Sequence, residues 1–67
     1  MKIIEKLGGY KNVVSTLVSA GWKSKNPYGT LVVQNHRGNM SKDVALILWE
    51  YCNKHGIEVK PEDFKGE

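Results

Sequence analysis

Glycines divide this chain into short segments. Gly8-Gly9, Gly21, Gly38 and Gly56 each follow a run of apolar or periodic residues. Glycine adopts the left-handed backbone that follows a helix end without steric cost, so each position predicts the end of an element. The segments between them are long enough only for short helices or strands. We therefore expect the 67 residues to form one small domain.

Three segments show the 3.6-residue apolar spacing of amphipathic helices, namely 1–7, 10–20 and 42–55. Ser41 has the side chain of an N-cap for the third helix, and Gly56-Ile57 suits a Schellman-type end. Trp49 lies off the apolar face of that helix, where it fills a side of the core or makes a dimer contact. The expected core residues are Ile3, Ile4, Leu7, Val13, Val14, Leu17, Val18, Val44, Ala45, Ile47, Leu48, Tyr51 and Cys52.

The segment 22–37 has no clear periodicity. Asn26-Pro27-Tyr28-Gly29 fits a turn with proline at its second position. The run 30–34 is short, apolar and β-branched, which is typical of a strand. With Pro27 near its first turn, the same run also suits a short helix. The sequence leaves both structures open and predicts burial of Leu31 in either.

The expected fold is mainly α, a small helix-turn-helix domain of about four short helices over residues 1–67. A short β-hairpin or extended segment at 22–37 is one option, and the C-terminus is expected to be extended. Pro61-Glu62-Asp63-Phe64 predicts a turn that folds Phe64 back onto the core. Residues 65–67 are expected to fray.

Charge is distributed unevenly along the chain. Residues 1–42 hold seven lysine or arginine residues and one acid, Glu5, whereas residues 43–67 hold three lysines and six acids. The segment 22–42 contains no acidic residue. This pattern indicates a basic face for a polyanion and an acidic tail. A solvated surface with an accidental imbalance is the alternative.

Few residues offer catalytic chemistry. Cys52 is the single cysteine, so an internal disulfide is impossible, and it shares a helix face with Leu48. His55 suits a helix C-terminus, and a Cys52–His55 pair has no charged site to lower the thiol pKa. No phosphate-binding glycine loop, carboxylate pair or metal-ligand cluster occurs. We expect no enzymatic activity, no catalytic residue, no metal, no cofactor and no small-molecule substrate.

The chain is expected to act in the cytoplasm. Its first residues do not form the apolar stretch of a signal peptide. The longest apolar run, 44–49, is far shorter than the roughly 20 residues that span a bilayer. A membrane partner is therefore not expected.

Several stretches resemble the Cro and YdaS-type helix-turn-helix regulators of phages and prophages. Residues 7–14, LGGYKNVV, resemble the opening of that family, two helices joined by Gly-Gly. Residues 33–41, VQNHRGNMS, running into 43–47, resemble the end of its recognition helix, the loop and the following helix. Residues 56–64, GIEVKPEDF, resemble its "V-x-x-E-D-L/F" ending.

The chain also departs from that pattern. Val18 stands where the family usually has a small residue in the turn, and Gly21 comes three residues later. The stretch 21–38 is longer than the usual turn and recognition helix. Asn35 stands where the family often has tryptophan. These differences leave open a recognition helix that is displaced, shortened or replaced by a hairpin acting as a wing.

The resemblance implies a Cro-like repressor that binds double-stranded DNA as a homodimer and occludes a promoter in the bacterial cytoplasm or nucleoid. Amide side chains can bond adenine and arginine can bond guanine in the major groove, whereas lysines hold phosphates. The candidate base contacts are Tyr28, Thr30, Gln34, Asn35 and Arg37. The candidate phosphate contacts are Lys11, Lys23, Ser24, Lys25, Asn26, His36 and Lys42.

Two other functions fit the same residues. One is a small phage-encoded inhibitor or adaptor that binds a protein and not DNA, using a hairpin-like 22–37 segment with Trp22 as an anchor. The other is nonspecific nucleic-acid binding. Salt separates DNA binding from protein binding, because contacts to phosphates weaken steeply as salt rises.

Overall fold

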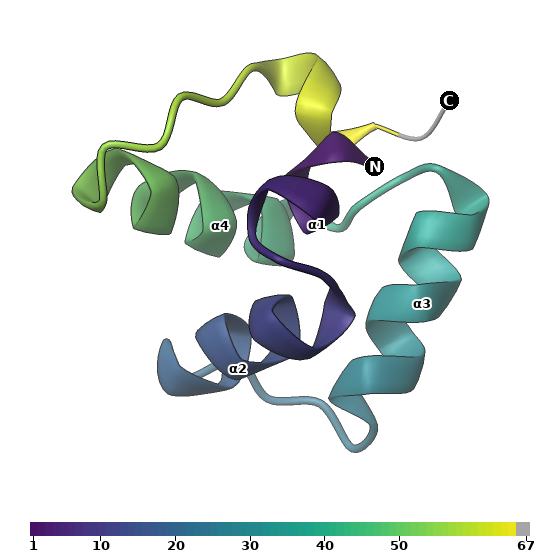
Figure 1. Ribbon diagram of the computed structural model, residues 1–67. Helices are drawn as coiled ribbons and strands as arrows, with labels where there is room; N and C mark the ends of the chain where they lie inside the picture. Colours follow the sequence, from purple (N-terminus) through teal and green to yellow (C-terminus); the bar gives the residue numbers. More distant parts are fainter. Residues whose placement is uncertain (66–67) are drawn as a thin grey trace.

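The computed structural model describes residues 1–65, which form four α-helices and one 3-10 helix and contain no strand. This confirms the expected mainly α fold. None of the helices in these residues is long and apolar enough to cross a membrane. Residues 66–67, part of the tail expected to fray, lie outside the described residues. The elements are α1 (Lys2–Lys6), α2 (Tyr10–Ser19), α3 (Pro27–Arg37), α4 (Lys42–Lys54) and η1 (Pro61–Phe64) (Figure 1).

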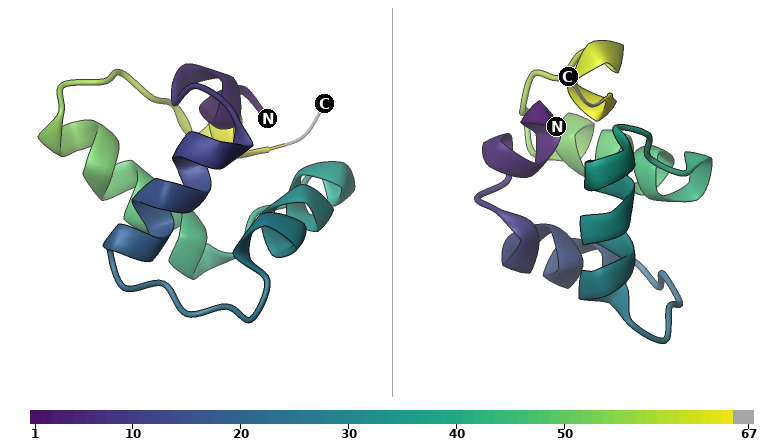
Figure 2. Two further views of the ribbon diagram at one scale, coloured as in Figure 1. Left: turned by 60° about the horizontal axis from the view of Figure 1, so that its bottom comes forward. Right: turned by 90° about the vertical axis from the view of Figure 1, so that its right-hand side faces the viewer.

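Helix α2 is the centre of the arrangement, since it packs against both α3 and α4, while α1 packs against η1. In Figure 1, α3 rises along one edge of the molecule and α4 lies on the other side of α1. The right-hand view of Figure 2 faces α3, and no other element lies in front of it. One side of α3 is therefore open to solvent along its length.

The glycine positions end the helices as expected. Gly21 has a φ of 94°, and its N–H donates to the Val18 carbonyl at 3.0 Å. The Trp22 N–H donates to the Leu17 carbonyl at 3.0 Å, which completes a Schellman motif. The end of α4 repeats the pattern, with the Ile57 N–H donating to the Cys52 carbonyl at 2.8 Å. The Schellman-type end predicted for the helix over 42–55 is thus confirmed.

The segment 22–37, for which the sequence left helix and strand open, contains helix α3. Asn26 is its N-cap, with the side-chain oxygen accepting from the Gly29 N–H at 3.1 Å, and Pro27 takes the first helical position. The predicted turn at 26–29 is wrong, because these residues begin a helix. The β-hairpin or extended option for 22–37 is also wrong. A proline needs no N–H partner in the first turn, and the cap satisfies a backbone donor, so a helix forms despite the β-branched residues.

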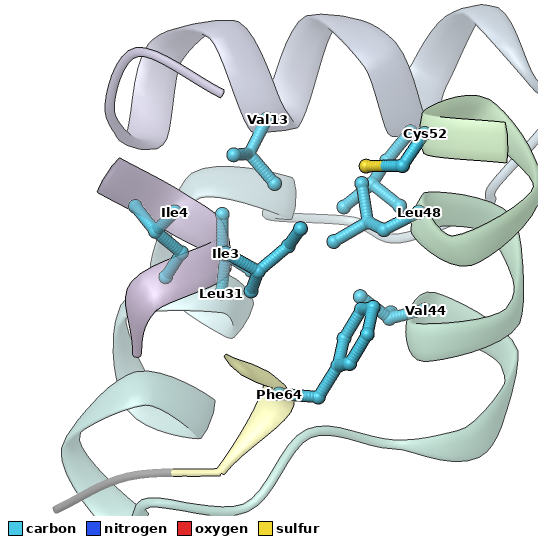
Figure 3. Close-up of a cluster of buried hydrophobic side chains, with 9 residues drawn as sticks. Ile3, Ile4, Val13, Leu31, Val44, Leu48, Cys52 and Phe64 are labelled. Atoms are coloured by element: carbon cyan, nitrogen blue, oxygen red, sulfur yellow. The ribbon is translucent and has the colours of Figure 1, made fainter. Parts of the chain in front are cut away.

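One apolar cluster fills the centre of the molecule (Figure 3). Leu31 is fully buried, as expected, and Phe64 folds back onto the cluster with 9% exposure. Val18 was expected in the core but is 50% exposed. The buried stripe of α2 runs through Val13 and Leu17, and Val18 lies about 100° further around the helix. The residues of this cluster are Ile3, Ile4, Val13, Leu17, Leu31, Val44, Leu48, Cys52 and Phe64.

An ion pair fastens the C-terminal segment to α1. The buried Asp63 carboxylate accepts from Lys6 Nζ at 2.8 Å and from the Lys60 N–H at 2.9 Å. The Lys6 hydrogen bond, followed by that of Lys60, holds the pKa of Asp63 below its usual value. Lys65 was expected to fray but forms an isolated antiparallel bridge with Asn39. The segment is therefore held near its end by two contacts to other elements, at Asp63 and at Lys65.

Candidate nucleic-acid interface

The solvent side of α3 is set by the burial of Leu31. Residues 29, 33, 36 and 37 lie on the opposite side of the helix, because their spacing of three and four residues repeats the helical turn. His36 and Arg37 are exposed, and Val33 is 47% exposed. The outer face of α3 thus combines one cation, one imidazole and one uncovered apolar side chain.

The acid-free stretch of the sequence covers whole elements of the fold. No acidic residue occurs between Lys6 and Lys42, so α2, the connection 20–26 and α3 carry none. The acids after this stretch lie on α4 and in the segment that follows it. A region with charge of one sign attracts ligands of the opposite sign from a distance. The exposed cations of the acid-free part, residues 7–41, and of the adjoining position 42 are Lys11, Lys23, Lys25, Arg37 and Lys42.

The Gln34 side chain is hydrogen-bonded to Ser41, at the surface of the protein. Its side-chain oxygen accepts from the Ser41 N–H at 3.0 Å, and its Nε2 donates to the Ser41 hydroxyl at 3.3 Å. Gln34 therefore braces the loop that leads into α4. Ser41 occupies the expected N-cap position, but its side chain makes no capping bond to the helix backbone. A hydrogen bond with Ser41 instead lowers the pKa of Asp43, helped by the Val44 N–H.

Asn35 is also committed to internal contacts. Its Oδ1 accepts from the α-amino group of Met1 at 3.0 Å, and its Nδ2 donates to the Tyr10 hydroxyl. These bonds join α3 to the start of the chain and to the first turn of α2. Asn35 is half-buried and faces the protein rather than the solvent.

The start of α3 is held by a similar network. The Ser24 and Thr30 hydroxyls are hydrogen-bonded at 3.1 Å, which ties the connection 20–26 to the first turn. The Tyr28 ring packs against Tyr10 with centroids 5.6 Å apart, yet Tyr28 remains 52% exposed. The Asn26 side chain accepts the N-cap hydrogen bond from the Gly29 N–H. A shallow hollow beside this region is lined by Val18, Trp22, Lys23, Ser24, Lys25 and Pro27.

The twelve residues expected to contact DNA therefore divide into two groups. Five make side-chain hydrogen bonds within the protein and position α3 and its neighbouring loops: Ser24, Asn26, Thr30, Gln34 and Asn35. Seven expose their side chains: Lys11, Lys23, Lys25, Tyr28, His36, Arg37 and Lys42.

Val33 is an exposed residue that sequence reasoning did not assign to the interface. It belongs to the apolar run 31–33, which suggests core when the type of element is unknown. Once residues 27–37 are a helix and Leu31 is buried, position 33 must lie on the opposite side. The two-residue separation of Leu31 and Val33 places Val33 on the outer face only if the segment is a helix, and the sequence did not establish that.

The groups that could support covalent or metal chemistry are few. Burial raises the pKa of the Cys52 thiol, which disfavours the nucleophilic thiolate. Among residues 1–65, no group of three or more histidine, cysteine or acidic side chains is placed to hold a metal ion.

Comparison with protein-family models, with curated proteins and with solved structures finds no match. The likeness to the Cro and YdaS-type regulators therefore rests on the sequence motifs. Helices α2 and α3 pack against each other across the connection 20–26.

Proposed function

We propose that this protein binds double-stranded DNA in a sequence-specific manner, as a transcriptional regulator of the kind found in phages and prophages. The observation that carries the proposal is the exposed side of α3, which lies in the acid-free part of the chain and ends in Arg37. No described element covers that side (Figure 2).

The dimensions of α3 suit the major groove. An α-helix with its side chains is about 10–12 Å wide, and the groove of B-DNA is about 12 Å wide. The eleven residues of α3 span about 16 Å. Arg37 would bond guanine O6 and N7, while Lys23, Lys25 and Lys42 would hold phosphates.

The internal bonds of α3 change the expected division of labour. Gln34 and Asn35 are no longer proposed as base readers, because both amides already have partners in the protein. Thr30 is likewise bonded to Ser24. These side chains instead set the position of the helix, and a correctly placed helix is what allows Arg37 to reach a base edge.

Regulation by such a protein needs neither a cofactor nor catalysis. A homodimer would read two half-sites about one DNA turn apart, and its presence on a promoter would exclude polymerase. Because Thr30, Gln34 and Asn35 are not proposed to contact bases, each protomer alone would discriminate weakly between DNA sequences. A dimer would double the number of base contacts. The two-fold symmetry of the bound site would report the dimer directly.

The test is a pair of titrations at low and moderate salt, one against random duplex and one against a duplex enriched by the protein from a random pool. We expect the enriched duplex to bind more tightly and both affinities to fall steeply with salt, by about 0.9 logarithmic units per phosphate contact and tenfold change in salt.

Two variants separate base reading from phosphate contact. Arg37→Ala should weaken the enriched duplex by roughly tenfold or more and leave random duplex less affected. Lys25→Ala should weaken both duplexes about equally and reduce the salt slope by about one. Lys54→Ala, in the last turn of α4 outside the acid-free part, is the matched control and should change neither. Equal behaviour of the Arg37 and Lys25 variants contradicts this division.

A protein partner is the competing function. The exposed rings and methyl groups of Tyr28 and Val33 would suit a protein surface as well as DNA. A protein interface built on a hairpin-like 22–37 segment with Trp22 as its anchor loses support, because 22–37 is not a hairpin and Trp22 is half-buried against the core. Failure of both duplexes to bind at low salt would favour a protein partner on α3.

A further inference from the structure

We infer that Val33 is a specificity-determining residue that contacts the 5-methyl group of a thymine in the major groove. The inference rests on the proposed DNA-binding function and names one base that α3 reads. It comes from the surroundings of Val33 and from the bonding of its polar neighbours.

The isopropyl group of Val33 is open to a ligand. Val33 is 47% exposed in the middle of α3, whereas Leu31 on the other side is fully buried. Side chains in a helix lean toward its N-terminus, so Val33 lies over the turn that contains Gly29, four residues earlier. Gly29 has no side chain that could cover it. The methyl groups of Val33 therefore stand free at the centre of the outer face.

Stability of the isolated protein does not account for this valine. Val33 is absent from the buried cluster and from the half-buried residues that pack on it. Valine is also a poorer helix former than alanine, because its branched side chain loses rotamer freedom against the preceding turn. An exposed valine at this position costs helix stability and gains nothing within the described residues.

The polar residues that usually recognise an A·T pair are not free on this face. Adenine is read by asparagine or glutamine, but Gln34 is bonded to Ser41, and Asn35 to Met1 and Tyr10. The remaining feature of an A·T pair in the major groove is the thymine methyl group, which is recognised by apolar contact. Val33, an exposed aliphatic side chain in the middle of α3, is placed to make that contact.

The spacing on α3 extends the inference to a short motif. Val33 and Arg37 are one turn apart, which is about 6 Å along the helix axis. Successive base pairs rise about 3.4 Å, so a helix lying along the groove places these side chains about two base pairs apart. We therefore expect a thymine and a guanine within about two base pairs of each other in each half-site.

Replacement of thymine by deoxyuridine tests the contact, because it removes only the methyl group. Each thymine of the enriched duplex is replaced in turn, and the affinity of the wild-type protein is measured. We expect one replacement per half-site to weaken binding about fourfold, the effect of one buried methyl group. In Val33→Ala, the unmodified duplex should bind about as weakly, and the same uracil should have no further effect.

Two further variants keep the test clean. Val33→Thr retains one methyl group and should retain part of the uracil effect. Leu46→Ala removes an apolar side chain that is 58% exposed on α4 and should keep the full effect. Circular dichroism of each variant checks that the helices are intact.

The negative outcomes are distinguishable. If the enriched duplex binds tightly and no uracil weakens it, or if the uracil effect persists in Val33→Ala, the assignment of Val33 is wrong and DNA binding stands. If no duplex binds at low salt, the proposed function and the assignment are both overturned.

Discussion

Asn35 and Arg37 lie two residues apart on α3 and have opposite surroundings. The Asn35 amide has a partner on each side, in the Met1 α-amino group and the Tyr10 hydroxyl. Arg37 is exposed in the last turn. At the scale of the residue, the internal partners of a polar side chain decide whether it is available to a ligand. Its chemical type alone does not.

Replacing Asn35 tests that view. Asn35→Ala should lower the free energy of unfolding by about 1–3 kcal/mol, because the Tyr10 hydroxyl and the Met1 amine each lose a partner. The ratio of affinities for enriched and random duplex should stay the same under conditions where the variant is folded. Urea unfolding measures the first quantity, and Asn53→Ala, exposed on α4, should change stability by less than about 0.5 kcal/mol. Unchanged stability with lost specificity would instead make Asn35 a base reader.

At the scale of the element, α3 depends on how it begins. Asn26 caps the helix through the Gly29 N–H, and a side chain at Gly29 would meet the cap, since a Cβ there would lie 2.4 Å from Asn26 Nδ2. Glycine is otherwise a poor choice within a helix. The Asn26 cap therefore depends on Gly29. The low helix propensity of glycine lowers the stability of α3, but a larger residue at position 29 would displace the Asn26 side chain.

A double-mutant cycle measures this dependence. Gly29→Ala alone should change stability little, because the gain in helix propensity, about 1 kcal/mol, offsets the loss of the cap, also about 1 kcal/mol. In the Asn26→Ala background the cap is already absent, so the same Gly29→Ala change should stabilise by about 1 kcal/mol. Thermal or urea unfolding of the four proteins gives the coupling energy. Additive effects would show that the two residues are independent.

At the scale of the whole molecule, one cluster of nine buried side chains holds every helix. A chain of 67 residues has a small total stability, roughly 3–10 kcal/mol. The Lys6–Asp63 ion pair and the bridge between Asn39 and Lys65 hold the C-terminal segment over that cluster. A single cavity in the core can therefore consume much of the stability available.

Two leucines on α4 provide a matched comparison. Leu48 is fully buried, and Leu48→Ala should destabilise the protein by about 2–5 kcal/mol, a large share of its total stability. Leu46 is 58% exposed, and Leu46→Ala should stay within about 0.5 kcal/mol of the wild type. Urea unfolding followed by circular dichroism measures both. A similar cost for the two substitutions would contradict the position of α4.

The candidate site was predictable only in part. The cations of the site and their separation from the acids follow from the sequence, and Lys23, Lys25 and Arg37 are exposed as a DNA interface requires. The amides were assigned to bases from residue type. The two partners of Asn35, Met1 and Tyr10, lie 34 and 25 residues away in the chain and could not be seen in local spacing.

The sequence by itself determined α1, α2 and α4, their glycine-marked ends, most of the core and the division of charge. These features depend on signals that act within a few residues, namely capping, helical periodicity and glycine geometry. Only the tertiary structure decided that 27–37 is a helix and that Val18 and Val33 face solvent. The run 30–34 has no clear periodicity of its own, and the side chains of α3 that become buried are set by its packing against α2, whose residues lie well before it in the chain.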